Sequence, residues 1–123
     1  MPDSQSFHFR GRHRIRYSWE FASLKQSGAR GFSRTMIMNW QPSVDRGYSR
    51  LGVVVSKRVG KAVTRSRTRR LLREAFREMQ HQILQPVDIV LVARKMIVGR
   101  RQSEVRRDLG RLLKRAGVMD AAS

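Results

Sequence analysis

Two short apolar runs bracket one long arginine-rich segment, and this arrangement constrains the fold more than any other feature of the sequence. The runs are RLGVVVSK at residues 50–57 and VDIVLVAR at residues 87–94. Both are rich in β-branched residues and nearly continuous in apolar character, which is typical of interior strands. A strand, a helix and a second strand in this order predict a parallel strand pair joined by a helical crossover.

The segment between the runs, SKRVGKAVTRSRTRRLLREAFREM at residues 56–79, is expected to be an amphipathic helix. At about 100° per residue, its apolar side collects Thr68, Leu71, Leu72, Ala75, Phe76 and Met79. Its other side collects Arg67, Arg70, Arg73 and Arg77, with Arg65 and Arg69 at the margin. Like charges at this spacing destabilise a helix, so the arginine face predicts a binding partner more than a solvated surface.

The charge of the whole chain narrows the kind of partner. The 123 residues include 27 Lys and Arg against 9 Asp and Glu, a formal net charge of +18. Such a chain repels itself unless a polyanion neutralises it. No apolar run reaches the roughly 18 residues of a membrane span, so we expect no membrane partner and a cytoplasmic location. Arginine matches phosphate oxygens and stacks on bases, which favours RNA or DNA.

A chain of this length is expected to form one domain, at residues 17–117. Residues 1–16 read as a basic, mobile N-terminal arm and residues 118–123 as a C-terminal tail. A short helix is expected to begin at Ser18 and end at Gly28, because Tyr17, Phe21 and Leu24 recur at helical spacing. A last helix is expected to begin at Ser103 and end at Gly117, with an apolar side made of Val105, Leu109, Leu112 and Ala116.

A further strand is expected at residues 34–40, RTMIMNW. Because side chains alternate along a strand, Thr35, Ile37 and Asn39 share one face and Met36, Met38 and Trp40 share the other. We expect the methionine and tryptophan face to be the buried one.

The residue types that carry protein catalysis are sparse. A metal-dependent nuclease needs several converging carboxylates, but the acids here are scattered, apart from Glu74 and Glu78. These two are most simply local partners of Arg70, Arg73 or Arg77. The chain has no cysteine, and its three histidines (His8, His13 and His81) are isolated in sequence. We therefore expect no catalytic residue and no metal ion held by the protein alone.

The residues around the basic segment resemble a known family. RLGVVVSKRVGKAVTRSRTRRLLREAFR at residues 50–77, followed by DIVLVARK at residues 88–95, is similar to the protein component of bacterial ribonuclease P. The similarity extends from about residue 14 to residue 116 in element order and spacing. The family carries an Arg-Asn-Arg motif in this helix, and here the motif reads Arg65, Ser66 and Arg67.

The resemblance implies a fold, a function and partners. It implies an α+β fold, a compact sandwich with a mixed sheet and a left-handed crossover through the basic helix, an exception to the usual handedness. It also implies a ribonucleoprotein endonuclease that removes the 5′ leader from precursor tRNA. The partners would be ribonuclease P RNA and precursor tRNA, with no obligatory protein partner. Mg²⁺, bound mainly by the RNA subunit and substrate, would serve chemistry located on the RNA.

The resemblance also implies two sets of site residues. The first set would bind the RNA subunit and comprises Lys57, Arg58, Lys61, Arg65, Arg67, Arg69, Arg70 and Arg73. The second would line a cleft for the single-stranded 5′ leader and comprises Phe21, Ile37 and Asn39. Phe21 fits a stacking role and a core role equally well, since it shares a helix face with Tyr17 and Leu24.

Three residues depart from the family pattern. Ser66 replaces the motif asparagine, Lys25 stands where many members have a second cleft aromatic, and Asn39 stands where many have tyrosine. We therefore expect this cleft to rely more on charge and hydrogen bonds than on stacking.

Three alternatives remain open. A structural RNA-binding protein of the ribosomal type would share the charge and the lack of catalytic groups. A DNA-binding module could place the arginine helix in a major groove. Against this alternative, a helix that reads bases usually presents Asn, Gln or Ser among its arginines, and here only Ser66 and Thr68 interrupt them. A helix that binds anionic membranes is disfavoured because two buried strands bracket it.

Overall fold

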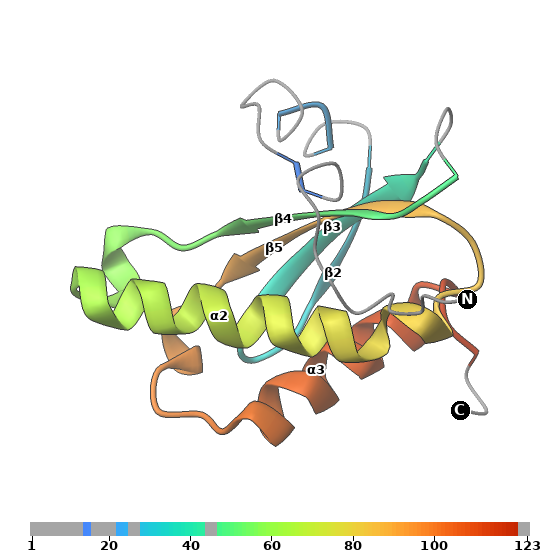
Figure 1. Cartoon of the computed structure of the whole chain (residues 1–123). Coiled ribbons are helices and arrows are strands. Elements are labelled where there is room, and N and C mark those ends of the chain that lie inside the picture. The colour runs from blue at the N-terminus through green and yellow to red at the C-terminus, as the bar shows by residue number, and fades with distance from the viewer. Residues whose placement is uncertain (1–13, 16–21, 25–27, 44–46, 121–123) are drawn as a thin grey trace.

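The computed structural model describes residues 14–15, 22–24, 28–43 and 47–120, which form a four-stranded sheet with its two long helices packed on one face (Figure 1). The strands are β2 (Ala29–Phe32), β3 (Met36–Pro42), β4 (Arg50–Val54) and β5 (Val87–Ala93), in the spatial order β2-β3-β5-β4. The long helices are α2 (Ala62–Met79) and α3 (Gln102–Arg115), and the short 3-10 helices are η2 (Lys57–Val59), η3 (Gln80–Gln82) and η4 (Lys95–Ile97). The expected α+β fold with a mixed sheet is confirmed.

The predicted strand-helix-strand unit is present. β4 and β5 pair in parallel, with Leu51 opposite Ile89, and α2 connects them. β3 pairs antiparallel with β5, with Met38 opposite Leu91, so β5 is an interior strand as expected. The left-handedness of the crossover stays a prediction from the family resemblance.

The expectation that residues 50–57 form an interior strand is wrong. β4 ends at Val54 and lies at the edge of the four-stranded sheet, beyond β5. A short piece of the N-terminal segment covers this edge, since the N–H of Ile15 donates to the carbonyl of Leu51 at 3.0 Å. An edge strand covered in this way has almost the same apolar composition as an interior strand.

The two faces of the sheet differ in what covers them. The face toward α2 and α3 carries Met36 and Met38 of β3, both almost fully buried, and Trp40 packs against the same core. This confirms the expected burial of the methionine face. The opposite face, called here the open face, carries Ile37 and Asn39 of β3, because neighbouring strand residues point to opposite sides.

The buried side of α2 agrees with the helical wheel in all but one residue. Thr68, Leu72, Ala75, Phe76 and Met79 are buried, and the hydroxyl of Thr68 donates to the Thr64 carbonyl at 2.8 Å. Leu71 is only half-buried, because it lies at the edge of the apolar stripe and lines a surface groove.

Strand β2 was not predicted. Its sequence, ARGF, is short and contains a glycine and a charged residue, so it lacks a strand signal. It pairs antiparallel with β3, with Gly31 opposite Met38. A Cβ at Gly31 would lie 3.1 Å from the Leu112 side chain, so glycine lets α3 pack closely against this strand.

The helix expected from Ser18 is described only at residues 22–24, which are helical. Gly28 donates its N–H to the Leu24 carbonyl at 2.9 Å, consistent with a helix end there. A Cβ at Gly28 would lie 2.6 Å from the Leu24 carbonyl oxygen and 2.7 Å from that of Trp40. This close approach of two backbone segments requires glycine.

The predicted last helix is confirmed as α3, with Val105, Leu109 and Leu112 buried. Gly117 has a φ of 79°, a left-handed conformation that favours glycine after a helix end. Val118 and Met119, expected in a C-terminal tail, are instead buried in the core. The chain turns back after Gly117, and Met119 forms an antiparallel bridge with Ile83.

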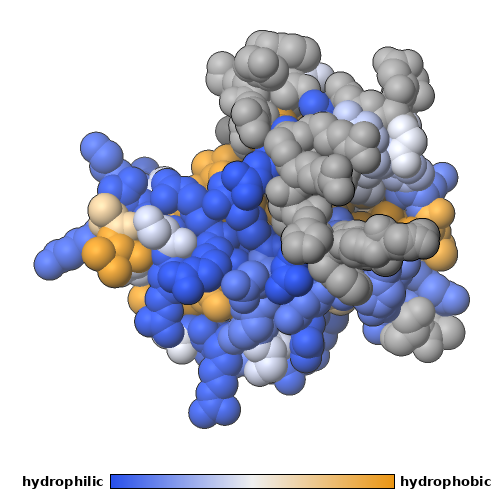
Figure 2. Space-filling model, in the orientation of Figure 1, coloured by the Kyte–Doolittle hydropathy of each residue, from blue (hydrophilic) through white to orange (hydrophobic). Residues whose placement is uncertain are grey.

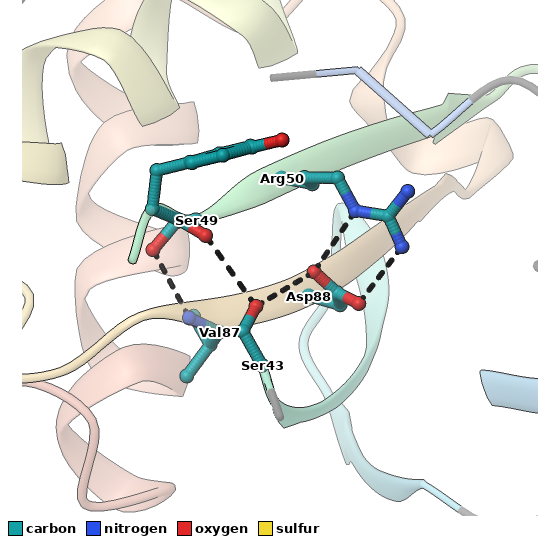
Figure 3. A network of polar contacts seen from close by, with 6 residues as sticks. Ser43, Ser49, Arg50, Val87 and Asp88 are labelled. Atoms are coloured by element: carbon teal, nitrogen blue, oxygen red, sulfur yellow. Dashed lines mark hydrogen bonds and ion pairs between the residues drawn. The ribbon is translucent and has the colours of Figure 1, made fainter. Parts of the chain in front are cut away.

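A buried ion pair fixes the junction of β4 and β5 on the open face (Figure 3). Arg50 Nη2 lies 3.0 Å from Asp88 Oδ2, and Arg50 Nε donates to Asp88 Oδ1 at 3.2 Å. The hydroxyl of Ser43 donates to Asp88 Oδ1 at 2.9 Å, which ties the end of β3 to the same carboxylate. Two charged groups in bidentate geometry thus hold three strands in register.

Candidate nucleic-acid interface

The basic helix begins at a tight turn. Gly60, between η2 and α2, has a φ of 154°, and a Cβ there would lie 3.1 Å from the Thr64 side chain. Arg65 donates from Nε to the Gly60 carbonyl at 3.2 Å. Arg65, one of the predicted RNA-binding residues, is thus partly committed to holding this turn.

The predicted RNA-binding residues divide by exposure. The exposed ones are Lys57, Arg58, Lys61, Arg67 and Arg70, and the half-buried ones are Arg65, Arg69 and Arg73. In the part of the chain that the structure describes, none of the eight forms an ion pair with an acidic side chain. Strongly hydrophilic surface predominates on the side of the molecule on which α2 lies in Figure 2.

The arginines of α2 form two flanks. Arg67 and Arg70 line a groove together with Ala62, Val63, Ser66, Leu71, Glu74 and Gln102, so this flank faces the start of α3. Ser66, at the family's asparagine position, is exposed in the same groove. The motif position therefore faces outward, where a partner can reach it.

Arg69 and Arg73 form the other flank, together with a residue that the sequence did not single out. The pKa of Arg73 is lowered, first by partial burial and then by the positive charges of Arg14 and Arg69. Arg14 comes from the N-terminal segment and forms an isolated parallel β-bridge with Leu51 of the edge strand β4. The signal for Arg14 was the arginine-rich stretch at residues 10–16, which was assigned to a mobile arm. These three cations lie close together, and none of them pairs with a carboxylate among the described residues. The cluster therefore predicts an anionic ligand.

The acids of α2 do not neutralise its arginine face. Glu78, expected to pair within α2, instead lies 3.3 Å from Arg106 of α3. Helix packing brings these two residues together, and spacing along one helix cannot reveal such a contact. Glu74 lines the groove with Arg67 and Arg70 but forms no ion pair within the described ranges.

The predicted leader-binding residues lie on the open face where the structure describes them. Ile37 is half-buried, and Asn39 is 6% exposed. Arg30 of the neighbouring strand donates from Nε to Asn39 Oδ1 at 2.9 Å. Asn39 thus already has an intramolecular partner, and Arg30 brings a cation to this face that the sequence did not point out.

The N-terminal segment covers one part of the open face. Ile15 and Leu24 are buried there against Val90, and Val92 packs beside them. Phe21 lies outside the described residues, as do Tyr17 and Lys25.

Groups of acidic or histidine side chains that could hold a metal ion do not occur in the described ranges. No described helix is long and apolar enough to cross a membrane. A basic helix face, an N-terminal arginine beside it and a sheet face that the described N-terminal residues cover only in part define an RNA-binding protein of α+β fold.

Comparisons with known proteins identify the family. A family model described as Ribonuclease P matches residues 9–117. The ribonuclease P protein component of Bacillus cereus is 32% identical over 107 residues, covering 87% of this chain and 93% of its own length. That of Desulfatibacillum aliphaticivorans is 41% identical over 90 residues, covering 73% and 75%.

Solved structures agree with the sequence matches. The Staphylococcus aureus ribonuclease P protein has a TM-score of 0.80 at 27% identity, covering 88% of this chain and 98% of its own. The Thermotoga maritima protein has a TM-score of 0.75 at 31% identity, covering 83% and 96%. The chain belongs to the ribonuclease P protein family, as a protein component of the bacterial enzyme.

Proposed function

We propose that this protein binds ribonuclease P RNA through the arginine face of α2 and holds the 5′ leader of precursor tRNA on the open face of its sheet. The resulting ribonucleoprotein removes that leader to form the mature 5′ end. The observation that carries the proposal is the cluster of Arg14, Arg69 and Arg73, in which partial burial and then the positive charges of Arg14 and Arg69 lower the pKa of Arg73. A phosphodiester backbone relieves this repulsion, and arginine suits phosphate geometry.

The chemistry of the reaction belongs to the RNA subunit in this proposal. Four of the described carboxylates serve structural roles: Asp88 pairs with Arg50, Asp108 accepts from Thr35, Glu78 pairs with Arg106, and Glu104 accepts from the N–H of Arg101. Activation of water by metal ions needs converging oxygen ligands, and the phosphates of the RNA and substrate supply them. Mg²⁺ is accordingly assigned to the RNA, and no protein residue is assigned a catalytic role.

The leader is assigned to the open face for a physical reason. A single strand needs exposed apolar or aromatic surface for its bases and cations for its backbone. The open face has both, since Ile37 lies between β2 and β5 and Arg30 lies beside Asn39. Precursor tRNA is then the substrate, no obligatory protein partner is needed, and the working location is the cytoplasm, where precursor tRNA is present.

A cleavage assay tests the proposal. A 5′-labelled precursor tRNA is incubated at low Mg²⁺ with a bacterial ribonuclease P RNA, with and without the protein. We expect cleavage at the mature 5′ end only when RNA and protein are combined, and none with protein alone. Tight binding to the RNA without any stimulation of cleavage would favour a structural RNA-binding protein of the ribosomal type. Cofractionation with ribosomal subunits would point the same way.

A further inference from the structure

A second arginine-rich surface lies away from the arginine face of α2. It is a hollow of about 570 Å³ between the β2–β3 turn and α3. Its lining includes five arginines and two acids: Arg34, Arg100, Arg107, Arg111, Arg115, Glu104 and Asp108. The proposed function does not use this hollow, called here the α3 hollow.

Both acids of the α3 hollow are already engaged. Asp108 Oδ2 accepts a hydrogen bond from the Thr35 hydroxyl at 2.6 Å, which ties the β2–β3 turn to α3. Glu104 accepts from the N–H of Arg101 at 3.0 Å and lies 3.6 Å from Arg100.

The hollow still carries an excess of positive charge, because five arginines line it against two acids. Arg107, Arg111 and Arg115 follow each other at intervals of four residues, which places like charges on one face of the helix. Arg34, Arg107 and Arg111 are exposed and form no hydrogen bond or ion pair within the described ranges. As on α2, an excess of cations on a folded surface favours a polyanion.

The aromatic side chain of Phe32 narrows the ligand further. Phe32 lines the α3 hollow and is 54% exposed, a high value for a phenylalanine. It is also opposite Ile37 in the pairing of β2 with β3, so it stands at the boundary between the open face and the hollow. An exposed ring among arginines offers a stacking platform beside phosphate contacts, as single-stranded nucleic acids require.

We propose that Phe32, Arg34, Arg107 and Arg111 bind single-stranded RNA, and that this RNA is the part of the 5′ leader that extends beyond the open face. The inference rests on the proposed function, since it continues the leader path from Ile37 across Phe32 onto α3. The surface is separate from the one assigned to the RNA subunit. The other flank of α3 packs on α2, where Arg106 pairs with Glu78 and Gly110 lies close to Met79. Both RNA contacts can therefore form at once.

The test uses the assembled ribonucleoprotein and two precursor tRNAs that differ only in leader length. The short leader reaches no farther than the open face, and the long one extends well past it. The variants are Phe32→Ala and the double substitution Arg107→Gln with Arg111→Gln. Matched controls are Leu84→Ala, which truncates another exposed apolar residue, and Arg101→Gln, which removes an exposed charge outside the hollow. Thermal unfolding checks that each variant is folded.

We expect Phe32→Ala to weaken binding of the long-leader precursor by at least about fivefold, the lower end of the stacking range. The double arginine variant should weaken the same precursor and flatten its salt dependence. The short-leader precursor and both controls should be unaffected.

Three results would overturn the inference. Equal losses of affinity for the short-leader and long-leader precursors would show that the extended part of the leader is not the ligand. A loss of affinity for the RNA subunit in the absence of precursor would assign the surface to that RNA instead. Unchanged binding in all variants would mean that the α3 hollow is only a solvated surface. If the wild-type protein fails to stimulate cleavage by the RNA, the proposed function itself fails, and this result is distinct from the other three.

Discussion

Arg30 and Asn39 are joined across the β2–β3 pair by a hydrogen bond of 2.9 Å, from the guanidinium Nε to the amide Oδ1. The pair lies on the sheet face that we assign to the 5′ leader. Asn39 is almost fully buried, so its oxygen depends on Arg30 for a partner. The cation is thus held in place by the residue that the family resemblance assigned to the cleft.

Replacing Arg30 by Ala is expected to lower the free energy of unfolding by about 1–3 kcal/mol, because it leaves the Asn39 oxygen without its charged donor. Denaturant unfolding of Arg30→Ala, Asn39→Ala and the double variant measures the coupling between the two residues. The expected result is a double variant less destabilised than the sum of the single changes. Strict additivity would show that the hydrogen bond contributes nothing to stability.

The ion pair between Arg50 and Asp88 should be more sensitive to truncation than its neighbours. Asp88→Ala removes the carboxylate that faces a largely buried guanidinium, so we expect a loss of about 3–5 kcal/mol in the free energy of unfolding. Ser43→Ala removes only one hydrogen bond to the same carboxylate and should cost about 1 kcal/mol. Similar values for the two variants in denaturant unfolding would contradict burial of the pair.

Truncation of side chains should destabilise the protein strongly on the buried side of α2 and hardly at all on its exposed side. Leu72 and Phe76 are fully buried, so replacing either by Ala should cost about 2–5 kcal/mol of stability. Val63 on the same helix is 82% exposed, and Val63→Ala should change stability by no more than about 0.5 kcal/mol. Chemical denaturation of the three variants checks the orientation of the helix. A large effect of Val63→Ala would mean that the helix is rotated.

The start of α3 predicts a pH dependence. The hydrogen bond from the Arg101 N–H, helped by the charges of Arg100, Arg101 and Arg107, lowers the pKa of Glu104 below its usual value of 4.5. A lowered folded-state pKa means that the carboxylate contributes stability above pH 4.5, and that this contribution disappears as the pH falls through the lowered pKa. The Tm of the wild type should exceed that of Glu104→Gln at neutral pH, and the two should converge in acid. Parallel curves would contradict this account.

Local periodicity was sufficient to predict much of the fold. The β-branched runs predicted β4 and β5, the helical wheel predicted the buried side of α2, and alternation predicted the buried methionines of β3. The family resemblance predicted the mixed sheet. These features depend on the residues of one element or on the order of successive elements, both of which a sequence displays directly.

The features that sequence reasoning missed all depend on contacts between distant elements. β4 lies at the sheet edge because β5 takes the position between β4 and β3, and the residues of β4 do not encode this arrangement. Glu78 pairs with Arg106 because α2 packs against α3. Arg14 joins the α2 cluster because residues 14 and 15 return to the edge of β4.

The central claim is that the arginine face of α2 binds the RNA subunit through phosphate contacts. The most direct test measures the affinity of the protein for ribonuclease P RNA over a series of salt concentrations, for the wild type, Arg67→Ala, Arg70→Ala and the control Arg101→Ala. Each α2 variant should bind more weakly, and its plot of log K against log salt should be shallower by about one unit of slope. Its free energy of unfolding should stay nearly constant. The control should keep the wild-type slope. An unchanged slope in folded Arg67→Ala and Arg70→Ala would contradict the claim and place the RNA on another face of the protein.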